Sequence, residues 1–376
     1  MKKEPGIIFV SLLLLFFILD VQSPVLFYGT QIFGLLFLVV YRFIVYPKIS
    51  KGALGLFFFS IIFLELICFY QYQYIGESIL FLVYQRVVFL ICVAVLLYDY
   101  LIKVRRLVLI QSIKYFIFLL SGIVITQFVG FYFLNLDRGF LDFGLILGGE
   151  ESRTWYLGDW VYRPVGLSSE PSMFVGVQFG LLTLQYILDK KAFFSRILGV
   201  VSLTLSMSFL GLILAALFLL ICYSKGIKNY VLGLVFLIIF YLFSYEKINA
   251  RLNLFADGGD GSNNIKFEAL SFFVSDPNIT LFGYGFLLPS SGSPEFYDAL
   301  LDLTFYINTI TIFGFLFGTL ILFFFAFYII NLRLGLREKL LVLLSLVKLS
   351  NPSFLFFSCF VLFFFTIIRI RGSLNK

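Results

Sequence analysis

The residues of this chain that could do chemistry are charged side chains at the edges of long apolar segments. The sequence RPVGLSSEPSMF, residues 163–174, places Arg163 and Glu170 where a polar loop meets an apolar run of helical length. Arginine suits a phosphate or diphosphate group, because its planar guanidinium makes paired, charge-assisted bonds and stays protonated when partly desolvated. Charged residues at membrane depth are functional candidates by default. This stretch is therefore the first candidate site.

Two further candidates, Arg251 and Asp302, lie near the two ends of a second long polar segment. Each candidate also has a purely structural explanation. The arginines could snorkel to water from a membrane interface, Ser168 or Ser169 could cap a helix whose first turn holds Glu170, and both acids could complement a helix dipole. In a chemical role, the glutamate could accept a proton from a hydroxyl group or hold the neighbouring arginine in place.

Composition excludes several other kinds of chemistry. The chain has no histidine, which removes histidine triads, histidine metal sites and imidazole proton relays. No GxGxxG or GxxxxGK[ST] sequence is present to hold a nucleotide phosphate. The four cysteines fall in apolar segments without CxxC spacing, which argues against disulfides and zinc. The sequence therefore predicts no cofactor and no metal.

The elements that must position these residues are membrane-spanning helices. Of the 376 residues, 61% are hydrophobic and 52 are phenylalanine, and the mean hydropathy is +1.03. Apolar runs long enough for a helix to cross about 30 Å of hydrocarbon recur without the two-residue alternation of a membrane barrel. We therefore predict an all-α, polytopic transmembrane bundle of about twelve spans. These spans cover residues 7–21, 25–46, 53–71, 77–98, 107–134, 165–188, 194–208, 209–224, 229–245, 301–331, 337–350 and 352–369.

Charge predicts how the chain is threaded. The short basic loops fall on one side of the membrane only if residues 194–224 cross twice, with a turn near Ser206, Ser208 and Gly211. By the positive-inside rule that side is the cytoplasm, and both termini lie there. The loops concerned contain Lys2, Lys3, Lys48, Lys51, Lys103, Arg105, Arg106, Lys190, Lys191, Arg196, Lys225, Lys228, Arg333, Arg337, Lys339, Arg369, Arg371 and Lys376.

Two long polar segments, 135–163 and 246–300, then become large outer loops of a single membrane domain covering residues 1–376. The net charge of +7 reflects this topology, because the basic residues are scattered over short inner loops and form no patch for nucleic acid. Within the second loop we expect a helix over residues 265–274 that stops at Asp276. The glycines at 283–285 and 314–318 would let backbones approach closely.

Residues 163–172 resemble the R..G.F.EPS signature of O-antigen polymerases of the Wzy type, within the wider O-antigen ligase and polymerase group. The turn at residues 206–211 is similar to the junction between two half-length spans in that group. The loop from Arg251 to Gly285, with the following helix and its glycines, is similar to the family's last outer loop. The resemblance extends over about residues 107–331 and is mainly one of topology.

The resemblance implies a metal-independent glycosyltransferase with a GT-C-like fold in the bacterial cytoplasmic (inner) membrane. Its substrate would be an oligosaccharide linked to undecaprenol through diphosphate, and a chain-length regulator would be a further partner. Arg163 and Arg251 would stabilise the leaving diphosphate, and Glu170 and Asp302 would orient or activate the acceptor hydroxyl. Glycan or lipid head groups would contact Arg138, Arg153, Tyr156, Trp160 and Tyr284. For Arg138 and Arg153, simple solvation is the alternative.

Other functions remain open at this point. Ligases of the same group carry a histidine at the end of the large outer loop, so its absence favours polymerisation over ligation. A lipid-linked oligosaccharide flippase or another secondary transporter would also be a twelve-span protein, but it would place its charges along a central cavity. A non-catalytic membrane partner of a polysaccharide assembly complex would tolerate loss of Arg163 and Glu170.

Overall fold

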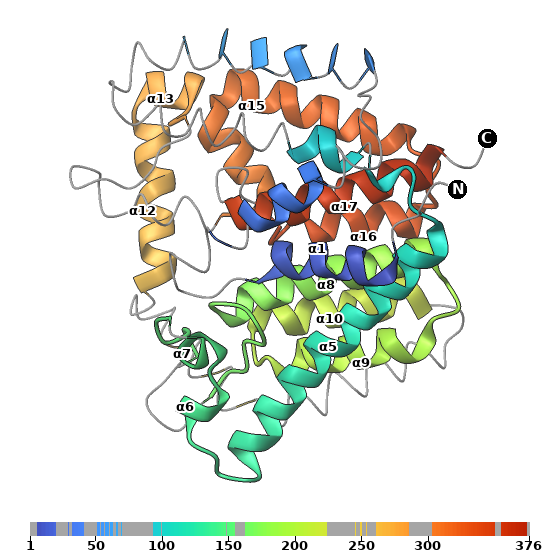
Figure 1. The fold of residues 1–376 in the computed structure, drawn as a ribbon. Helices are drawn as coiled ribbons and strands as arrows, with labels where there is room; N and C mark the ends of the chain where they lie inside the picture. Colours follow the sequence, from blue (N-terminus) through green and yellow to red (C-terminus); the bar gives the residue numbers. More distant parts are fainter. Residues whose placement is uncertain are drawn as a thin grey trace.

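The computed structural model of the chain is built from helices (Figure 1). Every regular element longer than an isolated bridge is helical among the residues that the structure describes. The all-α class predicted from the sequence is therefore confirmed. The described residues are 6–19, 32–40, 93–98, 100–147, 149–154, 162–223, 261–285, 303–349 and 355–373, with residue 29 and isolated residues within 51–69 and 245–253.

Among the described residues, three helices are long and apolar enough to cross a membrane: α5 (Arg106–Tyr132), α8 (Pro171–Leu188) and α15 (Phe305–Asn331). Three shorter apolar helices among the described residues correspond to other predicted spans, namely α1 (Ile7–Ile18), α9 (Phe193–Leu205) and α10 (Phe209–Tyr223). Two further helices, α16 (Leu336–Ser345) and α17 (Leu355–Ser373), lie within the last two predicted spans or extend just beyond them. The predicted spans at 25–46, 53–71, 77–98 and 229–245 lie largely or partly outside the described residues.

Helix α8 is the centre of the bundle, with 89% of its apolar window buried. It packs against α5, α9, α10, α16 and α17. Polar side chains hold these neighbours to it: the Gln178 amide donates to the hydroxyls of Ser121 and Ser202, at 2.9 and 3.1 Å. Such bonds between apolar helices contribute about 0.6 kcal/mol each in membrane proteins. A residue at either end of α8 therefore has a firmly placed backbone.

Helices α9 and α10 form a hairpin, as the sequence predicted for residues 194–224. Helix α9 ends at Leu205, Met207 adopts a left-handed backbone with φ of 52°, and α10 begins at Phe209. The end of α10 returns to the start of α9, because the Arg196 guanidinium lies over the Tyr223 ring at 5.6 Å. The predicted turn at Ser206–Ser208 is thus confirmed.

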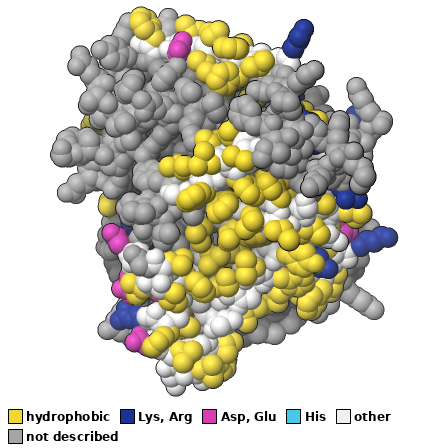
Figure 2. Space-filling model, viewed as in Figure 1, with side chains coloured by type: hydrophobic (Ala, Val, Ile, Leu, Met, Phe, Trp, Pro, Cys, Tyr) yellow, Lys and Arg dark blue, Asp and Glu magenta, His cyan; other side chains and the backbone are white. Residues whose placement is uncertain are grey.

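Several of the short basic loops meet at one end of the bundle. Arg106 donates to the carbonyl of Leu188, and Lys190 pairs with Glu338 at 2.9 Å. The Arg369 guanidinium lies 4.9 Å from the centre of the Tyr98 ring. Figure 2 shows the wider pattern, with hydrophobic side chains over the middle of the face and charged ones toward its left and right edges.

The second outer loop contains two helices, α12 (Gly261–Ser275) and α13 (Pro277–Phe282). The helix expected at residues 265–274 is confirmed, although it begins four residues earlier. Asp276 separates the two helices and caps α13, its carboxylate accepting from the amides of Asn278 at 2.9 Å and Ile279 at 3.3 Å. Figure 1 shows α12 at the left edge of the molecule, the side opposite the basic loops.

Helix α13 is held on α15 by two glycines. Gly283 and Gly314 have φ of 85° and 72°, and Gly314 interrupts α15. A Cβ atom on Gly283 would lie 2.3 Å from the Ile312 carbonyl oxygen, so only glycine permits this contact. The amides of Tyr284 and Gly285 then donate to the carbonyls of Thr311 and Ile312, at 2.8 and 2.9 Å. We call this contact the glycine lock. The close approach expected from the sequence is confirmed, but as a helix break rather than a contact between two straight helices.

Candidate functional site

Glu170 stands at the start of the central helix. Pro171 occupies the first position of α8, where its missing N–H costs nothing, and Glu170 is the N-cap. Its side chain makes no capping hydrogen bond. The expectation that Ser168 or Ser169 caps this helix is wrong, because Glu170, whose own backbone is extended, is the N-cap. The carboxylate therefore caps no backbone amide of its own helix.

Two cations from different parts of the chain surround the Glu170 carboxylate. The Lys348 ammonium lies 3.7 Å from Oε1, and Arg153 Nη1 lies 4.0 Å from Oε2. The Ser172 hydroxyl also donates to Oε1. Exposure of the three charged side chains falls from 74% for Arg153 to 20% for Glu170 and 9% for Lys348. The carboxylate thus joins a surface cation to a buried one.

Lys348, which lies beside Glu170, was not among the candidate residues predicted from the sequence. It follows α16, where hydrogen bonds of the i to i−3 type continue the chain from Leu346 to Lys348. Its stem crosses α8 at Gly176, where an added Cβ would lie 3.0 Å from Lys348 Cγ. A signal was present, since a lysine inside an apolar segment at residues 337–350 is itself a functional candidate.

Arg163 lies beside this group. The backbone places it, because the Arg163 amide donates to Thr154 at 2.9 Å and the Arg153 amide donates to Ser169 at 2.8 Å. The Arg163 guanidinium donates to the carbonyl of Arg153 at 3.3 Å. The structure therefore links Arg163 to the backbone of Arg153, and Arg153 to Glu170. A direct contact between Glu170 and Arg163 stays a prediction.

The loop carrying Arg163 is anchored to the end of α5. The Gln127 side chain accepts from the Gly166 amide at 2.8 Å and donates to the Leu141 carbonyl at 2.8 Å. One turn further on, the Tyr132 hydroxyl donates to the Tyr162 carbonyl at 2.7 Å. The Tyr162 side chain is fully buried, and this burial raises the pKa of its hydroxyl, with Asp142 adding to the effect. These contacts fix both ends of the 162–166 segment.

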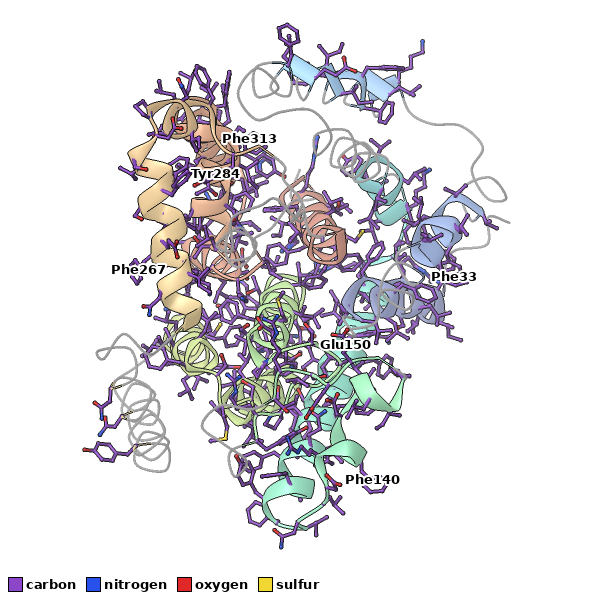
Figure 3. The ribbon with its side chains drawn as sticks, turned by 90° about the vertical axis from the view of Figure 1, so that its left-hand side faces the viewer. Phe33, Phe140, Glu150, Phe267, Tyr284 and Phe313 are labelled. Atoms are coloured by element: carbon purple, nitrogen blue, oxygen red, sulfur yellow. The ribbon has the colours of Figure 1, made fainter. Side chains whose placement is uncertain are left out.

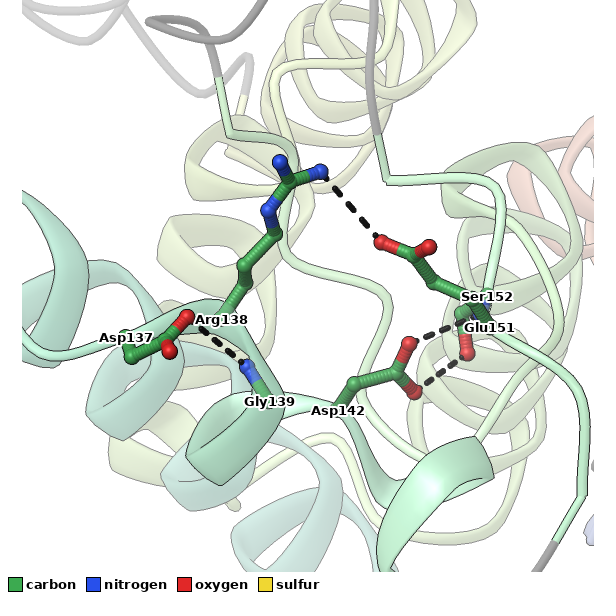
Figure 4. A network of polar contacts seen from close by, with 6 residues as sticks. All are labelled: Asp137, Arg138, Gly139, Asp142, Glu151 and Ser152. Atoms are coloured by element: carbon green, nitrogen blue, oxygen red, sulfur yellow. Dashed lines mark hydrogen bonds and ion pairs between the residues drawn. The ribbon is translucent and has the colours of Figure 1, made fainter.

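The first outer loop has a second polar network, drawn in Figure 4. Asp142 is buried and accepts from the amide and hydroxyl of Ser152 and the amide of Gly144, each at 2.7 Å. Arg138 pairs with Glu151 at 3.4 Å, and both side chains are more than a third exposed. Asp142 therefore organises the loop, while Arg138 forms a surface pair that contributes about 0–1 kcal/mol.

Of the remaining candidates predicted from the sequence, the structure describes only Tyr284. Arg251, Asp302, Tyr156 and Trp160 lie outside the described residues. Tyr284 is 4% exposed, packs on Phe273 with ring centres 5.9 Å apart, and donates to the Ala269 carbonyl at 3.3 Å. Figure 3 shows it beside α12, apart from Glu150. Its side chain supports the glycine lock.

The charges of this site favour binding of an anion. Arg153 and Lys348 face the Glu170 carboxylate at the N-terminus of α8, whose peptide dipoles add positive potential, and Arg163 donates to the backbone of Arg153 beside them. Within the described part of the chain, no group of three or more histidine, cysteine, aspartate and glutamate residues is placed to hold a metal ion.

No protein-family model matches the chain, and no curated protein matches it significantly.

Proposed function

We propose that the protein is a polysaccharide polymerase of the Wzy type. It would transfer a growing glycan from undecaprenyl diphosphate onto a second lipid-linked repeat unit, at the outer face of the bacterial cytoplasmic membrane. The observation that carries the proposal is the group formed by Arg163, Arg153 and Glu170 at the start of the central helix. It combines the sequence signature with two guanidinium groups, which suit the paired oxygens of a diphosphate.

Topology supports the same location. The chain would cross the membrane about twelve times, with both termini in the cytoplasm and a GT-C-like arrangement of helices. Lys190 and Glu338 meet at one end of the α8–α16 pair, with other basic loops nearby, whereas Glu170 and Lys348 meet at the opposite end. The positive-inside rule assigns the first end to the cytoplasm and the second to the outer face. The site would then lie where flipped lipid-linked sugars arrive.

In the proposed reaction, the acceptor hydroxyl oxygen forms a bond to the anomeric carbon of the donor glycan. The bond from that carbon to the diphosphate oxygen breaks, and the diphosphate leaves with the electron pair. Arg163, with Arg251 as second candidate, would stabilise the negative charge that develops on it. Arg153 would contact the lipid head group from the exposed edge of the site.

The two acidic candidates take different parts in this proposal. Both oxygens of the Glu170 carboxylate face cations, so Glu170 orients those cations more readily than it removes a proton. Asp302, which the sequence places at the start of the helix after the second outer loop, is the candidate base for the acceptor proton.

The polysaccharide ladder of a deletion strain tests the proposal. We expect wild-type protein to restore the ladder and Arg163→Ala to leave single repeat units at normal protein level. Arg163→Lys should restore only part of the ladder, because the ammonium keeps charge but loses the paired donors. Full ladders from both variants would remove the proposal, and repeat units that never reach the outer face would indicate a transporter instead.

A further inference from the structure

We propose that residues 133–147 form a membrane-docking surface, whose apolar side chains contact the acyl chains of the lipid leaflet at the C-terminal end of α5. The sequence predicts a polar outer loop from residue 135 onward, whereas the structure gives the first part of that loop an exposed apolar face. The inference goes beyond the proposed function, because such a surface would serve a polymerase and a transporter alike.

Large apolar side chains are exposed along this short segment. Phe140 is 78% exposed, the largest value for any large apolar side chain among the described residues. The other exposed members of the surface are Phe133, Leu134, Leu136, Leu145, Ile146 and Leu147. Figure 3 shows Phe140 at the rim of the molecule, whereas Glu150 of the same loop lies nearer its centre. Such a concentration of exposed apolar side chains marks an interaction surface rather than the single hydrophobic residues found on any protein.

The segment is folded back onto α5 instead of extending away from it. Asn135 has a left-handed φ of 51°, which lets the chain turn back after the helix. The Leu136 amide then donates to the Gly130 carbonyl at 2.9 Å. Leu141 covers the same glycine, since an added Cβ on Gly130 would lie 2.9 Å from Leu141 Cδ2. Helix α6 therefore lies beside the last turns of α5, at the depth where that helix ends (Figure 1).

Internal hydrogen bonds hold the backbone of the surface in place. Gln127 of α5 donates to the Leu141 carbonyl at 2.8 Å. The buried carboxylate of Asp142 accepts from Gly144 and Ser152, as described above. The loop thus has a polar, bonded interior and an apolar exterior, so its exposed side chains are presented by a fixed backbone.

Continuity with α5 indicates that the surface contacts lipid. This helix is long and apolar enough to cross a membrane, and the chain has no charged side chain from residue 115 to residue 136. Exposed apolar side chains continue from Leu119 and Val129 of α5 to Phe133 at the start of the surface. Asp137 and Arg138 follow, and charged side chains next to exposed apolar ones are typical of a segment that lies in a membrane interface.

The membrane-docking surface would also set the depth of the candidate site. Its Asp142 is bonded to Ser152, and the next residue is Arg153, whose amide donates to the Ser169 carbonyl at 2.8 Å. A surface held in the lipid leaflet would therefore keep the exposed Arg153 guanidinium at the level of the lipid head groups.

Photo-crosslinking identifies what the surface contacts. The variant Phe140→p-benzoylphenylalanine of the full-length protein would be irradiated in the membranes of the cells that express it, so that the probe bonds to a neighbouring C–H group. Mass spectrometry of the purified protein would then distinguish lipid adducts from protein adducts. Glu150→p-benzoylphenylalanine is the matched control, because Glu150 is exposed in the same loop but lies away from the rim. We expect about tenfold more lipid adduct at position 140 than at position 150.

A second probe position covers the case in which the Phe140 variant does not fold. Ile146→p-benzoylphenylalanine places the probe on the neighbouring α7, at another exposed apolar position. It should give the same excess of lipid adduct over position 150, because the proposal assigns both side chains to one surface.

Two results would overturn the inference. Adducts to a second copy of the chain or to another protein at positions 140 and 146 would show that a protein covers the surface. Equal, low yields of lipid adduct at positions 140, 146 and 150 would show that the surface faces water. Neither result would affect the polymerase proposal, which the polysaccharide ladder of Arg163→Ala tests separately.

Discussion

The two ends of the α8–α16 helix pair each have one lysine–glutamate contact. The two contacts differ in which partner is buried, in whether the glutamate caps a helix, and in the neighbouring charge. In the Lys190–Glu338 contact, Glu338 is the buried partner, its carboxylate accepts from the Gly335 amide at 2.9 Å, and Lys190 is 63% exposed. In the Lys348–Glu170 contact the lysine is buried, the glutamate makes no capping bond, and Arg153 adds a second cation.

This difference separates a structural ion pair from a candidate binding site. Glu338 satisfies the start of its own helix. Glu170 instead lies between two cations, Arg153 and Lys348. Whether a salt bridge in an apolar helix bundle is structural or belongs to a binding site therefore depends on the other hydrogen bonds of its carboxylate and on the neighbouring charges.

The largest contrast is expected between one arginine from each end. Arg163→Ala should lower the rate of polymer synthesis per molecule about 10²–10³-fold, the usual effect of removing a group that stabilises developing negative charge. Arg196→Ala should leave that rate nearly unchanged, because Arg196 lies between the Tyr186 and Tyr223 rings, at 5.5 and 5.6 Å. Synthesis rates normalised to protein level check this, and equal losses would abolish the distinction between the ends.

The next variant concerns the glycine lock between α13 and α15, which depends on backbone packing and not on charge. Gly314→Ala should reduce stability by about 3 kcal/mol, because φ of 72° is unfavourable for alanine and the new Cβ would lie 2.2 Å from the Leu281 carbonyl oxygen. Thermal unfolding in detergent measures the loss. Gly122→Ala is the control, since its Cβ would meet nothing within 4 Å. Equal melting temperatures for the two variants would contradict the observed contact.

The two glutamates provide the next contrast. Glu170→Gln should cost about 2 kcal/mol, below the roughly 3–5 kcal/mol of a fully buried pair, because Lys348 loses its counter-charge while the site remains partly solvated. The variant should also bind farnesyl diphosphate, a short isoprenoid diphosphate, more tightly, since the Glu170 carboxylate no longer competes with the ligand for Arg153. Glu338→Gln should cost about 1 kcal/mol through the weakened cap and leave binding unchanged. Affinity and melting temperature together check both variants; weaker binding by Glu170→Gln would contradict the competition.

The smallest effect concerns alkaline pH. Burial raises the pKa of Tyr284 above its usual value near 10, so the native state holds this proton more tightly than the unfolded state. The associated stability is fully present below pH 10 and is lost as pH rises above it. Tyr284→Phe should therefore flatten the decline of the melting temperature between pH 9 and 11, by an amount worth about 1 kcal/mol. An unchanged slope would mean that another group controls alkaline unfolding.

Much of the fold follows from the sequence because apolar length and loop charge are local properties. The helix at Pro171, the hairpin broken at Met207 and the helix within the second outer loop were all expected, since each depends on adjacent residues. The break at Gly314 was not expected. A glycine within an apolar run is compatible with a straight helix, and only the contact with Gly283 shows why it bends.

The candidate site could be predicted only in part, for a similar reason. Arg163 and Glu170 share one short motif, so the sequence alone brought them to attention. Lys348 joins them through a contact between residues 178 positions apart, and no spacing rule connects such positions. The capping serines were assigned wrongly because both lie close before the helix, and the extended backbone of Glu170 that excludes them is a tertiary feature.

The most direct test of the central claim is transfer by the purified protein. Wild-type protein in proteoliposomes would receive lipid-linked repeat units made in vitro, and polymer and released undecaprenyl diphosphate would be quantified together. If the protein is a polymerase, polymer should form with release of one lipid diphosphate for each new linkage, and Arg163→Ala should lose both products. Release without polymer, or movement of intact repeat units across the bilayer without release, would contradict it.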